Sequence, residues 1–219
     1  KNYIDVQPQK IVAKMDLEKN EIEYQEITQG QSIKEIRGDE EMSRAFLLTR
    51  LVNELGYLPE RIEIEHEYTA GRPHTNTSRI DVIVRDASGN AFLFIECKSP
   101  DAYSSDDKDQ IIEEQLYKVA GMERTEGNSV RYLVLYTTVE TDGKVADECI
   151  IIDTEKFPTF ADWAASRNFS NTLPARYGKA QKTPYIKASA KDLETDFSNE
   201  MLNQLQTDLH NVLWGGGGT

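Results

Sequence analysis

Alternating apolar and polar residues predict several strands along the chain. Residues 61–69 (RIEIEHEYT) alternate with a period of two, which is typical of a half-buried strand. Shorter alternating pieces within 10–28 predict one or two edge strands. The run 130–138 (VRYLVLYTT) is almost continuously apolar, as in a central strand, and 146–154 (ADECIIIDT) predicts another strand.

Helical spacing occurs in two stretches of the first 155 residues. Residues 39–56 predict a helix with Asp39 as its N-cap and Gly56 as its stop. The residues along one side of it are Met42, Ala45, Phe46, Thr49, Val52 and Leu55. Residues 109–123 predict a second helix after a Ser-Asp-rich loop (101–109). One side of the second helix carries Ile112, Leu116 and Val119. The order of elements predicts an α/β domain, with a mixed central sheet flanked by helices.

The C-terminal third has a different character. Residues 156–190 are irregular, basic and aromatic, whereas 191–214 carry apolar residues at helical spacing. The predicted organisation is therefore a domain over 1–155, a basic aromatic extension over 156–190 and a helical connector over 191–219.

Charge is unevenly distributed. The net charge of the whole chain is −13, which argues against non-specific binding to nucleic acid. Residues 161–191 contain six Lys or Arg and one acidic residue, a net charge of +5, so the remainder carries −18. The basic segment is thus a candidate surface for a negatively charged partner.

The composition predicts a soluble cytoplasmic protein that does not enter a membrane. Mean hydropathy is −0.59, and no run approaches the roughly 18 apolar residues of a membrane span. Cys97 and Cys149 lie far apart, which excludes a disulfide scaffold and fits a reducing compartment. No signal peptide is visible. Because the chain begins without Met and ends at GGGGT, we expect a piece of a longer protein.

The most apolar hairpin of the chain carries two carboxylates and an ammonium group near its open end. Residues 79–85 and 91–98 predict its strands, and the turn-forming residues 86–90 join them. With the turn centred near Ser88 and Gly89, Asp81 faces Glu96 at the open end, and Lys98 lies two residues beyond Glu96. Like charges directly opposite destabilise a sheet, so another group must offset them.

A divalent cation is one such group. Hard carboxylate oxygens suit magnesium, which polarises phosphoryl oxygens and lowers the pKa of a bound water. The Lys98 ammonium would orient that water or stabilise developing negative charge. The alternative is a simple salt bridge between Lys98 and either carboxylate. Two features weaken that alternative: the strands are apolar enough to be central, and Ser99-Pro100 ends the second strand at once.

The order of these residues resembles the PD-(D/E)xK nuclease signature. Asp81 precedes a turn and then Glu96-Cys97-Lys98, and the flanking segments are EExxR at Glu40–Arg44, R-I-D-V-I-V and F-I-E-C-K-S-P. Over roughly residues 35–140 the chain resembles the N-terminal nuclease domain of type I restriction endonuclease R subunits. This resemblance implies a restriction-endonuclease-like core.

The resemblance also implies roles for individual residues. Asp81 and Glu96 would ligate magnesium, with the Cys97 backbone carbonyl completing the shell. Lys98 would position the attacking water. Glu41, or alternatively Glu40, would add a carboxylate from the first helix. The other reading of these glutamates is compensation of the helix dipole.

Gln115 matches the start of a Q-xxx-Y element that often accompanies this family. The fifth position of that element is Val119 instead of Tyr, and Tyr117 lies on another face of the helix. Gln115 is thus a candidate catalytic residue by resemblance. Alternatively, it is an exposed helix residue.

Two basic groups are candidates for contact with the DNA backbone. The first lies in and just after the loop that leads to Asp81: Arg72, His74 and Arg79. The second lies in the basic extension: Arg176, Lys179 and Lys182. The first group alternatively consists of solvated loop charges. The second alternatively belongs to a segment that wraps the domain, with its aromatic residues filling satellite clusters.

The C-terminal end carries a second resemblance. LHNVLWGGGGT (209–219) resembles the junction that precedes the DNA methyltransferase region of fused restriction–modification proteins. It implies that 191–214 form a connecting helix and that a methyltransferase follows. Residues 215–218 also fit a flexible linker.

The first functional hypothesis is the magnesium-dependent DNA endonuclease domain of a restriction–modification system. It would hydrolyse phosphodiesters of double-stranded DNA with metal-activated water. Methyltransferase and specificity domains or subunits of the same system would choose the target. The alternative is a catalytically silent, nuclease-like module that binds DNA or acts as a scaffold. The missing Tyr favours this alternative, and the complete set of Asp81, Glu96 and Lys98 argues against it.

Overall fold

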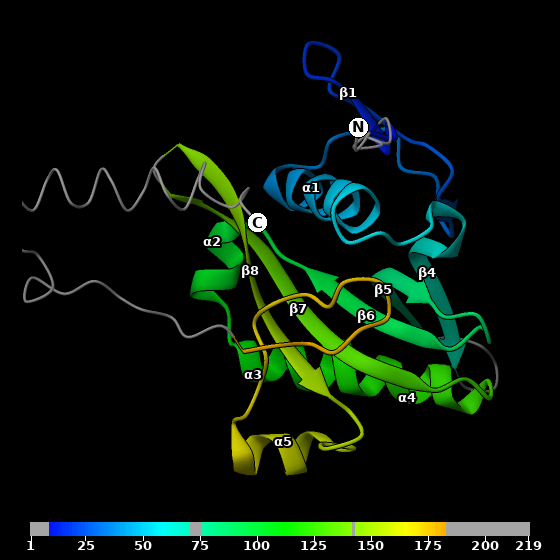
Figure 1. Ribbon diagram of the computed structural model, residues 1–219, viewed down its shortest axis with the longest axis vertical. Helices are drawn as coiled ribbons and strands as arrows, with labels where there is room; N and C mark the ends of the chain where they lie inside the picture. Colours follow the sequence, from blue (N-terminus) through cyan, green and yellow to red (C-terminus); the bar gives the residue numbers. More distant parts are fainter. Residues whose placement is uncertain (1–8, 71–75, 142, 183–219) are drawn as a thin grey trace, which may run out of the picture. The chain divides into compact units, whose positions relative to one another are not determined.

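Six strands form one mixed sheet in the computed structural model, which describes residues 9–70, 76–141 and 143–182 (Figure 1). In spatial order they are β3 (Thr28–Gln29), β4 (Ile62–Ala70), β5 (Asn76–Arg85), β6 (Ala91–Cys97), β7 (Val130–Thr141) and β8 (Lys144–Asp153). The pairs β3–β4 and β6–β7 are parallel, and the other neighbours are antiparallel. This confirms the predicted α/β class and the interior position of β7, and it is consistent with a restriction-endonuclease-like fold.

The N-terminal strands are arranged differently from the prediction of edge strands. Strands β1 (Ala13–Asp16) and β2 (Glu21–Tyr24) pair with each other in a separate two-stranded sheet. Only the two-residue strand β3 joins the edge of the main sheet. The alternating pattern gave the strands correctly, but it does not encode which sheet they join.

Helices cover both faces of the main sheet (Figure 1). Helix α1 (Asp39–Asn53) lies on one face, where Leu48 and Leu51 belong to the same core cluster as Val82 and Ile95. The other face is covered by a chain of helical segments with a second core cluster. These segments are α3 (Lys108–Ile111), the π-helical segment η2 (Ile112–Tyr117), α4 (Lys118–Thr125) and α5 (Phe160–Ser166). The sheet is thus a middle layer with a separate apolar core on each side.

The buried side of α1 is offset from the predicted apolar side. Met42 is 40% exposed and Thr49 is exposed, whereas Glu41 and Arg44 are buried together with the leucines. The prediction failed because two charged residues occupy the buried face. The cap prediction is also corrected: Gly38 is the N-cap, and Asp39 is the first residue of the helix.

Two segments predicted as irregular contain short helices. Helix α2 (Pro100–Ser105) lies in the predicted loop 101–109, and the Ser99 side chain accepts a hydrogen bond from Ala102 N–H at its start. Helix α5 lies in the predicted irregular segment, and Thr159 and Asp162 form a capping box there. A helix of six or seven residues shows too few turns for its period to be recognised.

The segment after α5 packs over the face of the sheet that carries α1. Ser170 forms an isolated bridge with Ile151, and Leu173 joins the first core cluster. The Tyr57 hydroxyl donates to Pro174 O at 2.6 Å, and the Tyr177 ring packs edge-on against Phe92. These contacts support the reading in which the extension wraps the domain.

The predicted connector 191–219 lies outside the described residues. Within the part of the chain that the structure describes, no helix is both long and apolar enough to cross a membrane.

Candidate functional site

Strands β5 and β6 part where the predicted carboxylates lie. The predicted register of the hairpin is confirmed, since Val84 pairs with Leu93 and the ladder ends at Val82 and Ile95. Asp81 comes next, and its Oδ2 accepts a hydrogen bond from the backbone N–H of Cys97 at 2.7 Å. Strand β6 continues alongside β7 as far as Cys97. The side chain of Asp81 therefore bridges the two strands at the point where their ladder ends.

A break in strand alternation turns two carboxylates toward α1. Val82 belongs to the core cluster on the α1 side, whereas Ile80, two residues earlier, belongs to the cluster on the opposite side. On β4, Glu65 lies between the pairs Ile64–Val82 and His66–Ile80 and has a φ of 54°. A left-handed conformation is uncommon for a residue other than glycine, and it marks an irregular site in the strand. Here it brings the side chains of Glu65 and Asp81 to Arg44 of α1.

Glu96 and Lys98 form a buried ion pair beside Asp81. Lys98 Nζ lies 2.7 Å from Glu96 Oε1, and Glu96 is 7% exposed. Burial, followed by the negative charge of Asp81, raises the pKa of Glu96 above its ordinary value, and the charge of Lys98 acts in the opposite direction. For Lys98, burial lowers the pKa, but the charge of Glu96 and the hydrogen bond to it outweigh that effect and raise the pKa overall. The ammonium therefore stays protonated at neutral pH.

Arg44 connects the carboxylates of three elements. Its Nη2 lies 2.7 Å from Glu65 Oε1 on β4 and 2.9 Å from Asp81 Oδ1 on β5. Its Nη1 lies 3.0 Å from Glu41 Oε2, one turn earlier on α1. The residue-type pattern assigned no role to Arg44 or Glu65. The EExxR segment includes Arg44 and is the signal that could have identified it. The alternation of β4 gave no sign that Glu65 turns toward α1.

The neighbouring glutamates of α1 have different surroundings. Glu41 is buried and accepts hydrogen bonds from the Tyr24 hydroxyl and from Arg44. The Glu40 side chain is 40% exposed, and burial and the charge of Asp81 raise its pKa against the opposing effect of Lys98. The charges of Asp81 and Lys98 therefore act on the Glu40 carboxylate.

The structure does not connect Gln115 to these residues. Gln115 lies in the π-helical segment η2, and its Oε1 is buried without a hydrogen-bond partner among the described residues. The Tyr117 hydroxyl donates to Phe157 O at 2.9 Å, and Val119 is buried in the second core cluster. Single π-helical turns frequently occur at functional sites, so Gln115 remains a prediction with a local irregularity beside it.

The predicted DNA contacts divide into three cases. Arg72 and His74 lie outside the described residues. Arg79 is half-exposed, and its Nε lies 2.6 Å from Glu65 Oε2. The remaining three, Arg176, Lys179 and Lys182, are exposed on the segment after α5.

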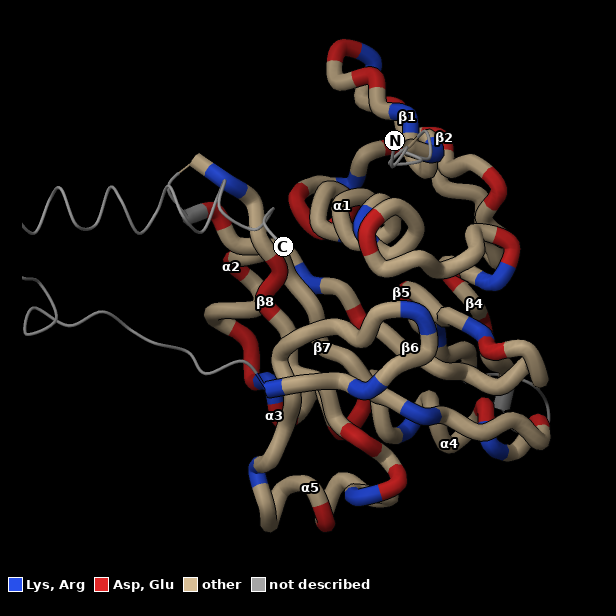
Figure 2. The backbone as a smooth tube through the Cα atoms, viewed as in Figure 1, with Lys and Arg blue, Asp and Glu red and all other residues tan. Residues whose placement is uncertain are grey.

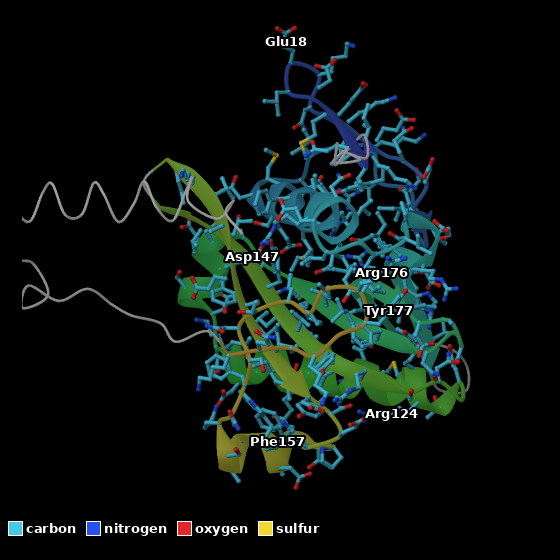
Figure 3. All side chains as sticks on the ribbon, viewed as in Figure 1. Glu18, Arg124, Asp147, Phe157, Arg176 and Tyr177 are labelled. Atoms are coloured by element: carbon cyan, nitrogen blue, oxygen red, sulfur yellow. The ribbon has the colours of Figure 1, made fainter. Side chains whose placement is uncertain are left out.

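The segment after α5 carries positive charge only. Figure 2 shows Lys and Arg at intervals along it and no acidic residue, in agreement with the sequence 168–182. Figure 3 shows the labelled residues Arg176 and Tyr177 next to each other on this segment. Tyr177 is anchored, because its hydroxyl donates to Arg85 O at 2.8 Å. The basic side chains are thus displayed on a fixed backbone.

A second charged group lies on the opposite face of the sheet. Arg85 Nη1 lies 2.6 Å from Glu123 Oε1, and Arg85 Nε lies 2.6 Å from Glu63 Oε1. The other oxygen of Glu123 accepts a hydrogen bond from the Tyr68 hydroxyl. Ligand atoms of His66, Glu123 and Glu126 lie within 4.8 Å of one another. Arg85 and Tyr68 thus hold Glu123 in a buried ion-pair network.

Comparison with known proteins finds one family model that matches part of the chain. No curated protein matches the chain. Residues 39–124 match the family model of the type I restriction enzyme R protein N terminus. The matched stretch runs from the start of α1 through almost all of α4, so it contains Arg44, Asp81, Glu96 and Lys98. The match supports a restriction-enzyme N-terminal domain in this part of the chain.

Proposed function

We propose that this chain is the magnesium-dependent endonuclease module of a restriction–modification system. The observation that carries the proposal is the meeting of Asp81, Glu96 and Lys98 where β5 and β6 part. The match of 39–124 to the N terminus of type I restriction enzyme R proteins supports it. The reaction is hydrolysis of DNA phosphodiesters by water.

The donor set fits magnesium. Two carboxylates, Asp81 and Glu96, lie together in a largely buried position with one ammonium beside them. Such oxygen donors suit a small, hard divalent cation, and its charge would offset their repulsion. Asp81, Glu96 and the Cys97 carbonyl would hold the ion together with a glutamate of α1. The ion would polarise a phosphoryl oxygen and lower the pKa of a bound water.

Lys98 acts as a cation in this proposal. Because its pKa is raised, it is a poor proton acceptor at neutral pH. Its ammonium, held by Glu96, orients the attacking water and stabilises negative charge that develops on the phosphate. The Thr137 hydroxyl donates to Lys98 O at 2.9 Å and fixes the backbone from which the side chain extends.

Of the two α1 glutamates, we propose Glu40 as the one that contributes to the site. The sequence-based prediction placed Glu41 first and Glu40 as its alternative. Glu41 already accepts hydrogen bonds from Tyr24 and Arg44, whereas Glu40 lies in the field of Asp81 and Lys98. Gln115 is a further candidate from the family resemblance alone.

Duplex DNA is the proposed substrate, and basic side chains would contact its phosphates. Arg79 is next to the site, and the segment after α5 supplies Arg176, Lys179 and Lys182. The net charge of −13 makes tight sequence-independent binding by this chain alone unfavourable. Methyltransferase and specificity domains or subunits would therefore bring the DNA to it.

A catalytically silent module is the second candidate. The observation that favours it is Arg44 Nη2, which already lies 2.9 Å from Asp81 Oδ1 and neutralises part of the site's charge. In such a module the charged group would only hold α1 to the sheet.

Metal titration of the full chain separates these candidates. Mn²⁺, a spectroscopic substitute for Mg²⁺, is titrated with and without a short duplex into wild type, Asp81→Asn and Glu96→Gln. Nicking of supercoiled plasmid is then measured for each. The endonuclease predicts metal binding and nicking that both variants lose. Wild type that binds no Mn²⁺ even with DNA, and nicks nothing, would establish the silent module.

Glu126→Gln is the matched control. It removes an acidic side chain near His66 and Glu123, a group in which three potential ligand atoms lie within 4.8 Å of one another. The proposal requires Glu126→Gln to bind Mn²⁺ as wild type does. Loss of binding in this variant alone would place the ion on the opposite face of the sheet.

A further inference from the structure

We infer that Arg44 is a positioning residue that fixes the Asp81 carboxylate for metal binding. The inference rests on the proposed function, because it takes Asp81 as a ligand. It assigns to Arg44 a role that is separate from ligation and from contact with substrate: it sets the orientation of the ligand.

The two oxygens of Asp81 are oriented by two different elements. Oδ2 accepts the Cys97 N–H at 2.7 Å, and Oδ1 accepts from Arg44 Nη2 at 2.9 Å. Together these hydrogen bonds restrain the rotation of the Asp81 carboxylate about its Cβ–Cγ bond. A carboxylate can accept about four hydrogen or coordination bonds, so each oxygen keeps room for a metal. Arg44 therefore orients Asp81 without exhausting its capacity to bind an ion.

Arg44 is itself held from three directions. Its side chain is 4% exposed, and Nη1 is fixed by Glu41, which accepts in turn from the Tyr24 hydroxyl of β2. Nη2 contacts both Asp81 and Glu65. Glu65 is the residue of β4 with the left-handed backbone conformation. A planar guanidinium makes these directed contacts at once, whereas an ammonium is a flexible point charge.

Outer contacts of this kind have a known effect on metal sites. Residues that orient a ligand typically change metal affinity or activity by about 10–100-fold when they are replaced. Charge works in the opposite direction here, because a cation beside the site repels a metal ion. A substitution that keeps the charge and changes the shape isolates the positioning effect, and Arg44→Lys is that substitution.

The opposite face of the sheet offers a matched control. Arg85 is also largely buried and pairs with two carboxylates, Glu63 and Glu123. Arg85→Lys makes the same chemical change in a comparable environment, away from Asp81. Both variants should lower the melting temperature, but only Arg44→Lys should change metal binding.

The experiment is Mn²⁺ titration of the full chain with a short duplex, followed by thermal unfolding and plasmid nicking. We expect about 10-fold weaker Mn²⁺ binding in Arg44→Lys, wild-type binding in Arg85→Lys and no binding in Asp81→Asn. Raising the Mn²⁺ concentration should restore nicking in Arg44→Lys and not in Asp81→Asn. A purely structural role would lower only the melting temperature.

Several outcomes would overturn the inference and are distinct from failure of the proposed function. Folded Arg44→Lys that binds Mn²⁺ as tightly as wild type, or more tightly, would make Arg44 a structural ion-pair partner or a competitor of the metal. Wild type without Mn²⁺ binding would remove the proposed function instead. If Arg44→Lys does not fold, Tyr24→Phe decides, because it releases only the far end of the chain Tyr24–Glu41–Arg44. Unchanged Mn²⁺ affinity in Tyr24→Phe would then overturn the inference.

Discussion

Adjacent glutamates on α1 show how one helical step separates a buried partner from a half-exposed carboxylate. Glu41 faces inward and is enclosed by Tyr24 and Arg44. Glu40 is rotated by about 100° around the helix and is partly exposed, and the charges of Asp81 and Lys98 act on its pKa. The two residues should therefore differ in what their loss costs the protein.

Glu41→Gln should destabilise the fold, and Glu40→Gln should not. Removing the Glu41 charge leaves Arg44 with one fewer buried partner, which costs about 1–3 kcal/mol, or several degrees in melting temperature. Glu40 is partly exposed, so its replacement should leave the melting temperature within a degree or two and weaken Mn²⁺ binding. Thermal unfolding and Mn²⁺ titration of the two variants measure this. If Glu41→Gln instead weakens Mn²⁺ binding and Glu40→Gln leaves it unchanged, Glu41 is the carboxylate that contributes to the site.

At the residue scale, the spacing of residues in the sequence was sufficient to predict the charged residues of the hairpin. It was insufficient to predict Arg44 and Glu65, which contact Asp81 or lie beside it. Asp81, Glu96 and Lys98 follow from strand register and a well-defined turn, which act over short distances in sequence. Arg44 was missed because a buried charge defeats an apolar-stripe analysis of a helix. Glu65 was missed because its position depends on one backbone dihedral angle that the residue type does not encode.

At the element scale, β3 and β4 approach closely at a glycine. Gly30 N–H donates to Ile64 O at 2.8 Å, and a Cβ on Gly30 would lie 2.2 Å from the carbonyl oxygen of Glu65. Backbone cannot move aside as a flexible side chain can. The glycine therefore allows the close contact that holds β3 against the irregular residue of β4.

Gly30→Ala should destabilise the protein by about 1–3 kcal/mol, as overpacking does. Gly121→Ala is the control, because a Cβ on Gly121 of α4 meets nothing within 4 Å and alanine favours a helix by up to about 1 kcal/mol. Urea unfolding of both variants should give changes of opposite sign. Equal stability of Gly30→Ala and wild type would mean that β3 can be displaced at little cost.

The ion pairs of β4 and β5 on the opposite face predict a pH dependence. Burial alone would raise the pKa of Glu63, but hydrogen bonds with His66 and Arg85 outweigh it and lower the pKa to about 2. The hydrogen bond with Glu63 raises the pKa of His66. Glu63 thus stabilises the fold above its unfolded pKa of about 4.5, and this is lost as pH falls toward 2. His66 stabilises it below about 6.5, and this is lost as pH rises through its raised pKa.

The melting temperatures of wild type and Glu63→Gln measure this effect. Their difference should be largest between about pH 4.5 and 6.5, where both groups are charged. It should shrink on the acidic side as Glu63 is protonated. On the alkaline side it should shrink only in part, because Arg85 still pairs with Glu63. A difference that stays constant from pH 3 to pH 8 would contradict the assigned ion pairs.

Long strands and short helices differ in how well the sequence pattern predicts them. Long alternating or apolar runs gave β4 to β8, because a strand of seven or more residues shows its period clearly. Helices α2 and α5 depend on a cap and on tertiary packing more than on their own period. Pairing of β1 with β2 in a separate sheet depends on contacts that no local pattern records.

At the scale of the whole molecule, a strongly acidic protein carries a basic strip in the part of the chain that the structure describes. Arg176, Lys179 and Lys182 lie exposed on the segment after α5, which has no acidic residue from 168 to 182. This strip is anchored to the sheet through Tyr57, Leu173 and Tyr177. Its position on the α1 side, the side toward which Asp81 turns, suits a partner that also reaches the proposed site.

Replacing these three side chains with Gln should weaken duplex binding and reduce its salt dependence. Each lost phosphate contact lowers the slope of log K against log salt by about 0.9, so three contacts give about 2.7. The matched control replaces three other exposed residues, Lys118 and Arg124 of α4 and Lys156 after β8. Fluorescence anisotropy at several salt concentrations measures both slopes. Equal slopes for the two triple variants would show that the basic strip does not contact DNA phosphates.

The hydrogen bond from the Cys97 N–H to Asp81 has an evolutionary consequence. The Asp81 side chain closes the gap between two strands, so selection for folding alone would retain an aspartate here after all chemistry had been lost. The Lys98 side chain pairs with the Glu96 side chain and not with the backbone of a neighbouring strand. In a descendant that had lost activity, we therefore expect Lys98 to be substituted before Asp81. Under the proposed function, the lysine is therefore a better marker of an active nuclease among relatives of this chain than the aspartate.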